Sequence, residues 1–146
     1  LGVGGEPIEV QLVSLMPLPS TAFEHRLRVD LRLRNPNNRA YQIEGLRFLL
    51  DVNGSRLASG VSSESATLPR LGEVVVPVTT TTSLLDLVNQ IVAFGQQEQP
   101  QFSYDLRGKI FLAGLWGSLP FQRQGSPDDL IPRSRAPKQQ KGEVTQ

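Results

Sequence analysis

The stretch Phe23-Glu-His-Arg-Leu-Arg-Val-Asp-Leu-Arg-Leu-Arg34 decides the fold, because its residue types alternate strictly. Odd-numbered positions carry apolar residues or a histidine, and even-numbered positions carry charges. Successive side chains on a β-strand point to opposite faces, so this period of two predicts a strand with one face in a core and the other in water. We expect the strand to end at residues 35–38, Asn-Pro-Asn-Asn, because proline lacks an amide donor and asparagine side chains stabilise turns.

A second alternation, apolar at positions 46, 48, 50 and 52, leads into Asn53-Gly54, the strongest hairpin signal in the chain. Asn-Gly readily adopts the positive φ angles of a type I′ turn. With these two residues as the loop, the register pairs Val52 with Ser55, Asp51 with Arg56, Leu50 with Leu57, and Leu46 with Val61. Such a register would gather the apolar pairs on one face of the hairpin and leave the charged pair on the other.

The rest of the chain predicts further strands and one helix. Period-two patterns indicate strands over residues 8–16, with Ser14 on the side of the apolar residues, and over 74–82, 102–112 and 119–123. Pro77 cannot donate to a ladder, so its strand should lie at an edge or be bulged there. Apolar residues at helical spacing after Ser83 predict an amphipathic helix over 84–94. Six or seven strands with one helix favour an antiparallel β-sandwich.

Composition bounds the domain organisation. We expect a glycine-rich flexible linker over residues 1–7, one domain over 8–125, and a disordered tail over 126–146, where too little apolar surface remains to offset the entropy of ordering. The chain opens on Leu1 rather than methionine, so we expect an upstream segment, such as a signal sequence, to have been removed.

Several classes of chemistry find no support. A net charge of +1 gives no electrostatic case for nucleic acid, and the absence of cysteine excludes thiolate metal sites and cysteine nucleophiles. The single histidine, His25, rules out sites that need two, and no serine lies in a Gly-x-Ser-x-Gly setting. The early glycines precede a strand rather than open a helix, so they predict no phosphate loop. We therefore predict no enzyme, no cofactor and no metal.

The best candidate for a binding surface is a stripe of arginines on one strand face, comprising Arg26, Arg28, Arg32 and Arg34. Contact with an anionic lipid or polymer is one interpretation. A solvated strand face is the other, and it is favoured because Glu24 and Asp30 interleave with the arginines and aromatic platforms are missing. Trp116, between glycines, is either an exposed contact residue or the closure of a core.

Taken in order, the motifs resemble the type 2 late embryogenesis abundant family, also described as the water stress and hypersensitive response domain, over residues 8–125. The residues that carry the resemblance are Asn35, Pro36, Asn37, Asn53, Gly54, Gly72, Gly108, Pro120 and Phe121. In that family these positions would be structural turn residues rather than a ligand site.

The resemblance implies a β-sandwich of fibronectin type III or immunoglobulin-like character, without catalytic residues, from a family tied to desiccation and stress tolerance. Bacterial members are often exported and lipid-anchored, which implies the cell envelope or periplasm, with the cytoplasm left open. We expect a monomeric module that protects through weak contacts with membranes or labile client proteins. The alternative is an adhesion or assembly module that binds a protein partner through the strand containing Pro77 or through the helix face.

Overall fold

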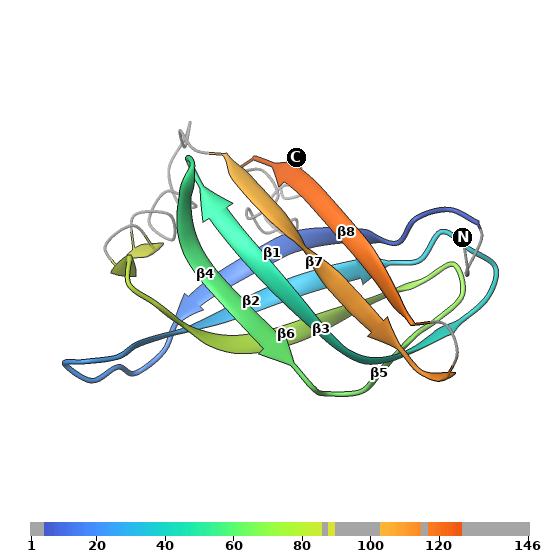
Figure 1. The fold of residues 1–146 in the computed structure, drawn as a ribbon, viewed down its shortest axis with the longest axis horizontal. Helices are drawn as coiled ribbons and strands as arrows, with labels where there is room; N and C mark the ends of the chain where they lie inside the picture. Colours follow the sequence, from blue (N-terminus) through green and yellow to red (C-terminus); the bar gives the residue numbers. More distant parts are fainter. Residues whose placement is uncertain (1–4, 86–87, 90–102, 115–116, 127–146) are drawn as a thin grey trace, which may run out of the picture.

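The computed structural model describes residues 5–85, 88–89, 103–114 and 117–126, which form eight β-strands (Figure 1). The strands are β1 (Glu9–Pro17), β2 (His25–Arg34), β3 (Tyr41–Val52), β4 (Ser55–Ser62), β5 (Ala66–Leu68), β6 (Glu73–Thr82), β7 (Tyr104–Leu112) and β8 (Ser118–Gly125). All of them belong to one antiparallel sheet in the order β1-β2-β6-β4-β3-β7-β8, with β5 paired to β3.

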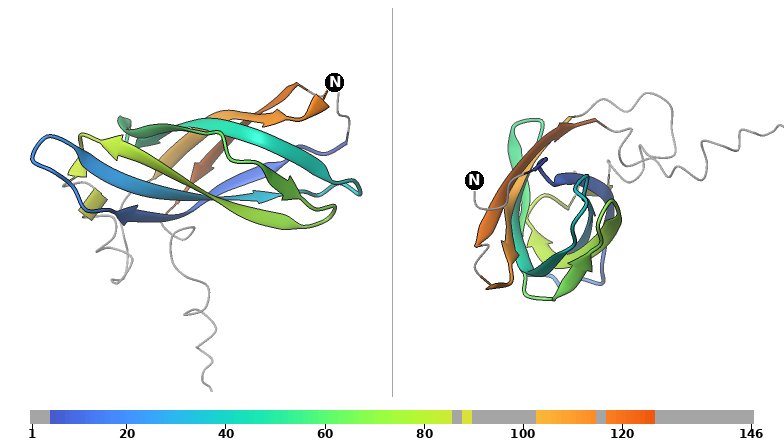
Figure 2. Two further views of the ribbon diagram at one scale, coloured as in Figure 1. Left: turned by 90° about the horizontal axis from the view of Figure 1, so that it is seen from below. Right: turned by 90° about the vertical axis from the view of Figure 1, so that its right-hand side faces the viewer.

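The sheet curls over on itself. In Figure 1, β1, β2 and β6 cross behind β3, β4, β7 and β8, and the end view in Figure 2 shows the strands curving into a half-barrel. Inside the curl, the Leu12 amide donates to the Tyr104 hydroxyl at 3.4 Å, which links β1 to β7. The prediction of a mainly antiparallel β domain is confirmed. Two separate stacked sheets are not confirmed, because hydrogen-bonded ladders join all the described strands into one sheet.

The strict alternation of β2 builds one wall of the core. Leu27, Val29, Leu31 and Leu33 are fully buried, and they face the buried alternate residues of the opposite half of the sheet, such as Phe48. Fully burying one such side chain stabilises the fold by about 1.5–3 kcal/mol. The predicted strand begins two residues too early, however: β2 starts at His25, and Phe23 is 98% exposed in the turn before it.

The Asn53-Gly54 hairpin is confirmed, because both residues have positive φ, 50° and 85°. Its register is correct at the first two pairs, but a bulge between Leu50 and Asp51 then shifts it by one residue. Leu50 pairs with Ala58 and Leu46 with Ser62, so the predicted partners Leu57 and Val61 are wrong. One extra residue sends the following side chains to the other face, which leaves Val61 on the outer face and 69% exposed.

A similar bulge occurs in β1 between Leu12 and Ser14. It brings Leu15 into the core and turns Ser14 outward, where its hydroxyl donates to Asp30 at 2.8 Å. The simple alternation that put Ser14 on the side of the apolar residues is therefore wrong.

Pro77 lies in β6, which pairs with β2 in an unbroken register, so the strand is not bulged there. On its other side β6 meets β4 only at Thr81, opposite Ser59. At Pro77 that side has no ladder partner among the described residues, so the strand is an edge locally, as proline requires.

Most of the predicted helix over 84–94 lies outside the described residues, as do residues 1–4, Trp116 and residues 127–146. Within the described part, the Val88 amide donates to the Leu84 carbonyl at 3.0 Å, which is a single helical hydrogen bond, and Val88 is buried. Among the residues that the structure describes, there is no helix with the length and apolar character needed to cross a membrane.

Candidate functional site

Asn35 organises one end of the molecule. Its side chain is only 1% exposed, and its Nδ2 donates to the carbonyls of Arg39 and Pro69 at 2.7 and 3.0 Å. Its Oδ1 accepts the Asn37 amide at 2.9 Å, and its own amide donates to the Gly72 carbonyl at 2.8 Å. Two turns that are far apart in the chain are thereby joined through one buried amide. Its polar atoms are occupied within the fold, so Asn35 has a structural role.

Asn37 extends this network to the start of the chain. Its Oδ1 accepts the Glu6 amide at 2.7 Å and its Nδ2 donates to the Glu6 carbonyl at 2.8 Å. The Asn37 carbonyl in turn accepts the amide of Leu71, a residue with φ of 53°. Both asparagines of the motif therefore hold the backbone in place, while Pro36 between them is exposed.

Gly108, Pro120 and Phe121 lie within strands, so their description as turn residues is wrong. Gly108 is in the middle of β7, opposite Phe121 on one side and Phe48 on the other. A Cβ at Gly108 would overlap the Arg47 carbonyl oxygen and come within 2.9 Å of the Phe121 ring. The glycine is needed because β3 and β7 approach closely there.

All four predicted arginines lie along β2, interleaved with its buried residues. Arg28 Nε lies 3.2 Å from Asp30 Oδ1 as an ion pair, and Arg28 Nη2 donates to Oδ2 at 3.2 Å. Arg32 lies 4.0 Å from Glu73 and donates to Gln11 at 3.5 Å.

Arg34 stands between two acidic neighbours, opposite Glu9 on β1 and Glu73 on β6. Arg26 is exposed and lies opposite Thr81. Carboxylates on three adjacent strands therefore lie beside the arginines, and two of the four arginines, Arg28 and Arg32, form ion pairs with them.

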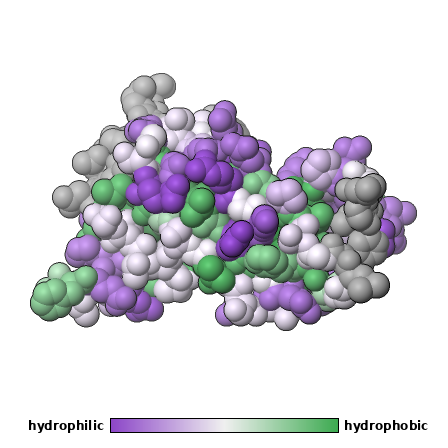
Figure 3. Space-filling view, viewed as in Figure 1, coloured by the Kyte–Doolittle hydropathy of each residue, from purple (hydrophilic) through white to green (hydrophobic). Residues whose placement is uncertain are grey.

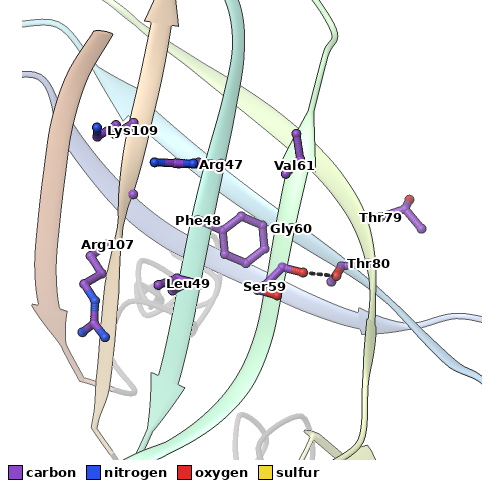
Figure 4. Close-up of a pocket in the computed structure, with 11 residues that line it drawn as sticks. Arg47, Phe48, Leu49, Ser59, Gly60, Val61, Thr79, Thr80, Arg107 and Lys109 are labelled. Atoms are coloured by element: carbon purple, nitrogen blue, oxygen red, sulfur yellow. Dashed lines mark hydrogen bonds between the residues drawn. The ribbon is translucent and has the colours of Figure 1, made fainter.

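A groove lies where the two halves of the curled sheet meet, and residues of β3, β4, β6 and β7 line it. Figure 3 shows this side of the molecule, where hydrophilic surface is bordered by hydrophobic patches. The groove has a volume of about 700 Å³. Its lining includes Arg47, Leu49, Gly60, Val61, Thr80 and Lys109 (Figure 4).

Two features of the backbone open this groove. The strands β4 and β6 pair only at Ser59 and Thr81, so they diverge beyond that point, although the Thr80 hydroxyl also donates to the Ser59 carbonyl. Gly60 adds no side chain, and a Cβ there would lie 2.8 Å from the Phe48 ring. The hollow is thus built into the strand pairing and the choice of glycine.

The charges along the groove are unevenly paired. Arg107 donates to Asp105 at 2.7 Å and lies 3.7 Å from Asp51, which also pairs with Arg56. Sequence reasoning predicted the Asp51 and Arg56 pair but not this extended network, because Asp105 and Arg107 come from a strand some fifty residues further along the chain.

Arg47 and Lys109, by contrast, lie directly opposite each other on β3 and β7. Neither makes an ion pair with any other residue in the described part of the chain. No local pattern in the sequence points to this pair, because it forms only when β3 pairs with β7 in this register.

No cluster of three or more histidine, cysteine, aspartate or glutamate side chains in the described ranges is arranged to hold a metal ion. His25 is half-buried at the start of β2, and its Nδ1 has no hydrogen-bond partner among the described residues.

Comparison with known proteins identifies the family. The family model "Late embryogenesis abundant protein" (LEA_2) matches residues 30–125, so the chain belongs to this family. No curated protein sequence matches it significantly.

Among solved structures, the chain is similar to a solution structure from Arabidopsis thaliana, with a TM-score of 0.54 at 12% identity, covering 80% of this chain and 78% of that one. A putative late embryogenesis abundant (LEA) protein gives a TM-score of 0.45 at 13% identity, covering 81% of this chain and 68% of that one. A crystal structure of a protein from Archaeoglobus fulgidus gives 0.44 at 14% identity, covering 82% and 93%. At these identities the similarity concerns the fold alone.

Proposed function

We propose that this chain is a non-enzymatic protein that protects against desiccation and water stress. It acts at the cell envelope through weak contacts with membranes or labile client proteins. The observation that carries the proposal is the LEA_2 match over residues 30–125, because this family points to a stress-related role and is generally non-enzymatic. The described surface is consistent with it, since its turn residues serve the fold rather than a reaction.

The β1–β2 turn offers a contact point for a membrane. Phe23 stands at its tip with 98% of its surface exposed. The turn is held by its own hydrogen bonds, from the Thr21 amide to the Glu24 carbonyl at 3.0 Å and from the Phe23 and Glu24 amides to the Thr21 hydroxyl at 3.2 and 3.0 Å. An aromatic ring presented on a convex, ordered tip suits the interface of a lipid bilayer, where aromatic side chains are enriched.

The protective role is tested by drying or freezing a labile enzyme with this protein, and with an equal mass of an inert protein. We expect the enzyme to keep more activity with this protein. Protection equal to that of the inert protein would contradict the proposal.

The membrane contact is tested by co-sedimentation with phospholipid vesicles. We expect Phe23→Ser to reduce the bound fraction, since it removes the apolar tip. Val75→Ser is the matched control, because Val75 is also an exposed apolar residue but lies in the middle of β6. An equal loss for both variants would show that the tip has no special role.

A second candidate is an assembly module that binds a protein partner through β6. It is favoured by the side of β6 that lacks a ladder partner near Pro77 and by the exposed Val75 beside it. We would expect Val75→Lys to abolish a stoichiometric complex with a purified partner, while Arg26→Gln leaves that complex intact.

A further inference from the structure

We propose that the groove above β3, β4 and β7 binds a single amphiphilic anion, a free carboxylate with one hydrocarbon chain. In Figure 1, β3, β4 and β7 cross in front of β2, the strand of the arginine stripe, and lie apart from the β1–β2 turn. This proposal does not depend on the protective function proposed above, and its test uses a different measurement.

Arg47 and Lys109 would bind the carboxylate head group of the ligand at one end of the groove. They are direct cross-strand partners, so their Cβ atoms lie about 4.5–5.5 Å apart. Two like charges in this arrangement destabilise a sheet, yet no described carboxylate pairs with either of them. The next residues in this cross-strand row are Val61 on β4, opposite Arg47, and Pro120 on β8, opposite Lys109. Neither of them carries a charge.

The neighbouring rows show that this part of the sheet can carry acids. One row has Asp51 opposite both Arg56 and Asp105, and Arg107 bridges the two aspartates. Arg107 thus reaches two carboxylates, whereas Arg47 and Lys109 face each other and form no ion pair with any carboxylate among the described residues. An anion from solution would supply the missing charge and would receive charge-assisted hydrogen bonds from both side chains.

The remainder of the groove suits a hydrocarbon chain. Figure 4 shows Val61 level with Arg47 and Lys109, and Gly60 and Leu49 following toward Ser59 and Thr80. Val61 is exposed and Leu49 is half-buried, so a bound chain would cover apolar surface that water now contacts. The Thr80 hydroxyl is already bonded to the Ser59 carbonyl, which leaves its methyl group to face a ligand without an unmet hydrogen bond.

The size of the groove favours a single molecule over a bilayer. A volume of about 700 Å³ lies in the range typical of small-molecule sites, roughly 300–1,000 Å³. A flat lipid surface would contact only the rim of this hollow on the outer face, whereas one chain can lie within the hollow between β4 and β6.

The test is isothermal titration calorimetry of the full chain with dodecanoate below its micelle concentration. Two ligands serve as controls: acetate has the head group without the chain, and dodecyltrimethylammonium has the chain with the opposite charge. We expect saturable, single-site binding of dodecanoate and at least about tenfold weaker binding of both controls. Equal binding of the cationic surfactant, or binding only to anionic vesicles and not to the monomer, would overturn the proposal.

Variants locate the site. We expect the double variant Arg47→Gln/Lys109→Gln to weaken dodecanoate binding by about tenfold. Arg26→Gln/Arg34→Gln is the matched control, because it removes the same charge from the exposed face of β2 and should leave the affinity unchanged. An equal loss in both double variants would mean non-specific attraction by net charge and would overturn the assignment.

The variant Lys109→Glu separates binding from folding. A glutamate opposite Arg47 would supply the missing carboxylate within the chain, so this variant should unfold at a slightly higher temperature and lose dodecanoate binding. Full binding by Lys109→Glu would contradict the proposal. Because we expect this variant to be the more stable protein, a loss of binding would not be due to unfolding.

Discussion

The outer faces of β2 and of the β3–β7 pair both carry several cations, but their neighbours differ. Along β2, Arg28 meets Asp30 and Arg34 lies between two glutamates on adjacent strands. Across β3 and β7, Arg47 lies opposite Lys109, and their other cross-strand neighbours, Val61 and Pro120, carry no charge. The arginine stripe, which is plain in the sequence, thus has acidic neighbours in the folded sheet, whereas two cations from strands far apart in the chain face each other without one.

The difference shows that cross-strand register, rather than spacing along one strand, decides where charge accumulates on a sheet. Residues on one strand face are two positions apart, but their nearest neighbours are the opposite residues on adjacent strands. Four substitutions test this contrast between the two faces.

The largest effect is expected for Gly108→Ala, which acts on the β3–β7 face. Its Cβ would overlap the Arg47 carbonyl, so the two strands would have to separate, and we expect a loss of about 3 kcal/mol in the free energy of unfolding. Chemical denaturation measures it. Gly60→Ala is the control, because its Cβ would meet the movable Phe48 and Val78 side chains and should cost about half as much. A smaller loss for Gly108→Ala than for Gly60→Ala would show that the close approach is not needed.

The next effect is expected for Asp30→Ala, which acts on the β2 face. Asp30 is 14% exposed and accepts hydrogen bonds from Ser14 and Arg28. Because Arg28 is more exposed and screened by solvent, we expect a loss of about 1.5 kcal/mol rather than more. Thermal unfolding measures it, and an unchanged stability would show that the β2 charges are not paired in solution.

A smaller effect of opposite sign is expected for Lys109→Glu. Replacing the repulsion with an attraction across the pair should raise the free energy of unfolding by about 0.5 kcal/mol at low salt. The gain should shrink at high salt, because exposed charges are screened. A loss of stability would indicate that Arg47 and Lys109 do not repel each other.

The smallest effect is expected for Arg26→Gln. Arg26 is exposed and has no ion-pair partner among the described residues, so the free energy of unfolding should change by less than about 0.5 kcal/mol. Denaturation of this variant beside Asp30→Ala separates the free arginine of the stripe from the paired one. A loss as large as that of Asp30→Ala would mean that Arg26 has a partner outside the described residues.

The sequence predicted what depends on local pattern. The alternation of β2, the type I′ turn at Asn53-Gly54 and the edge character of β6 at Pro77 follow from residue types within a few positions, and the structure bears them out. The bulges after Leu12 and Leu50 were missed, because an extra residue in one strand is determined by the partner strand.

The candidate site was largely beyond sequence reasoning. Gly108 was recognised as a signature residue but assigned to a turn, since its close contact with the Arg47 carbonyl exists only once β3 and β7 are paired. Arg47 and Lys109 lie sixty-two positions apart in the chain, and no local pattern joins them. The prediction that the arginines of β2 share one strand face is correct, but their acidic neighbours Glu9 and Glu73 come from other strands.

The most direct measurement is a titration of the isotope-labelled protein with dodecanoate, followed through amide chemical shifts. The predicted result is a saturable set of shifts confined to residues 47–49, 59–61, 79–80 and 107–109, which line the groove, with no change at the arginines of β2. Shifts that instead follow the β2 arginines, or that spread evenly over both faces, would contradict the claim that the unpaired cations of β3 and β7 form the anion site.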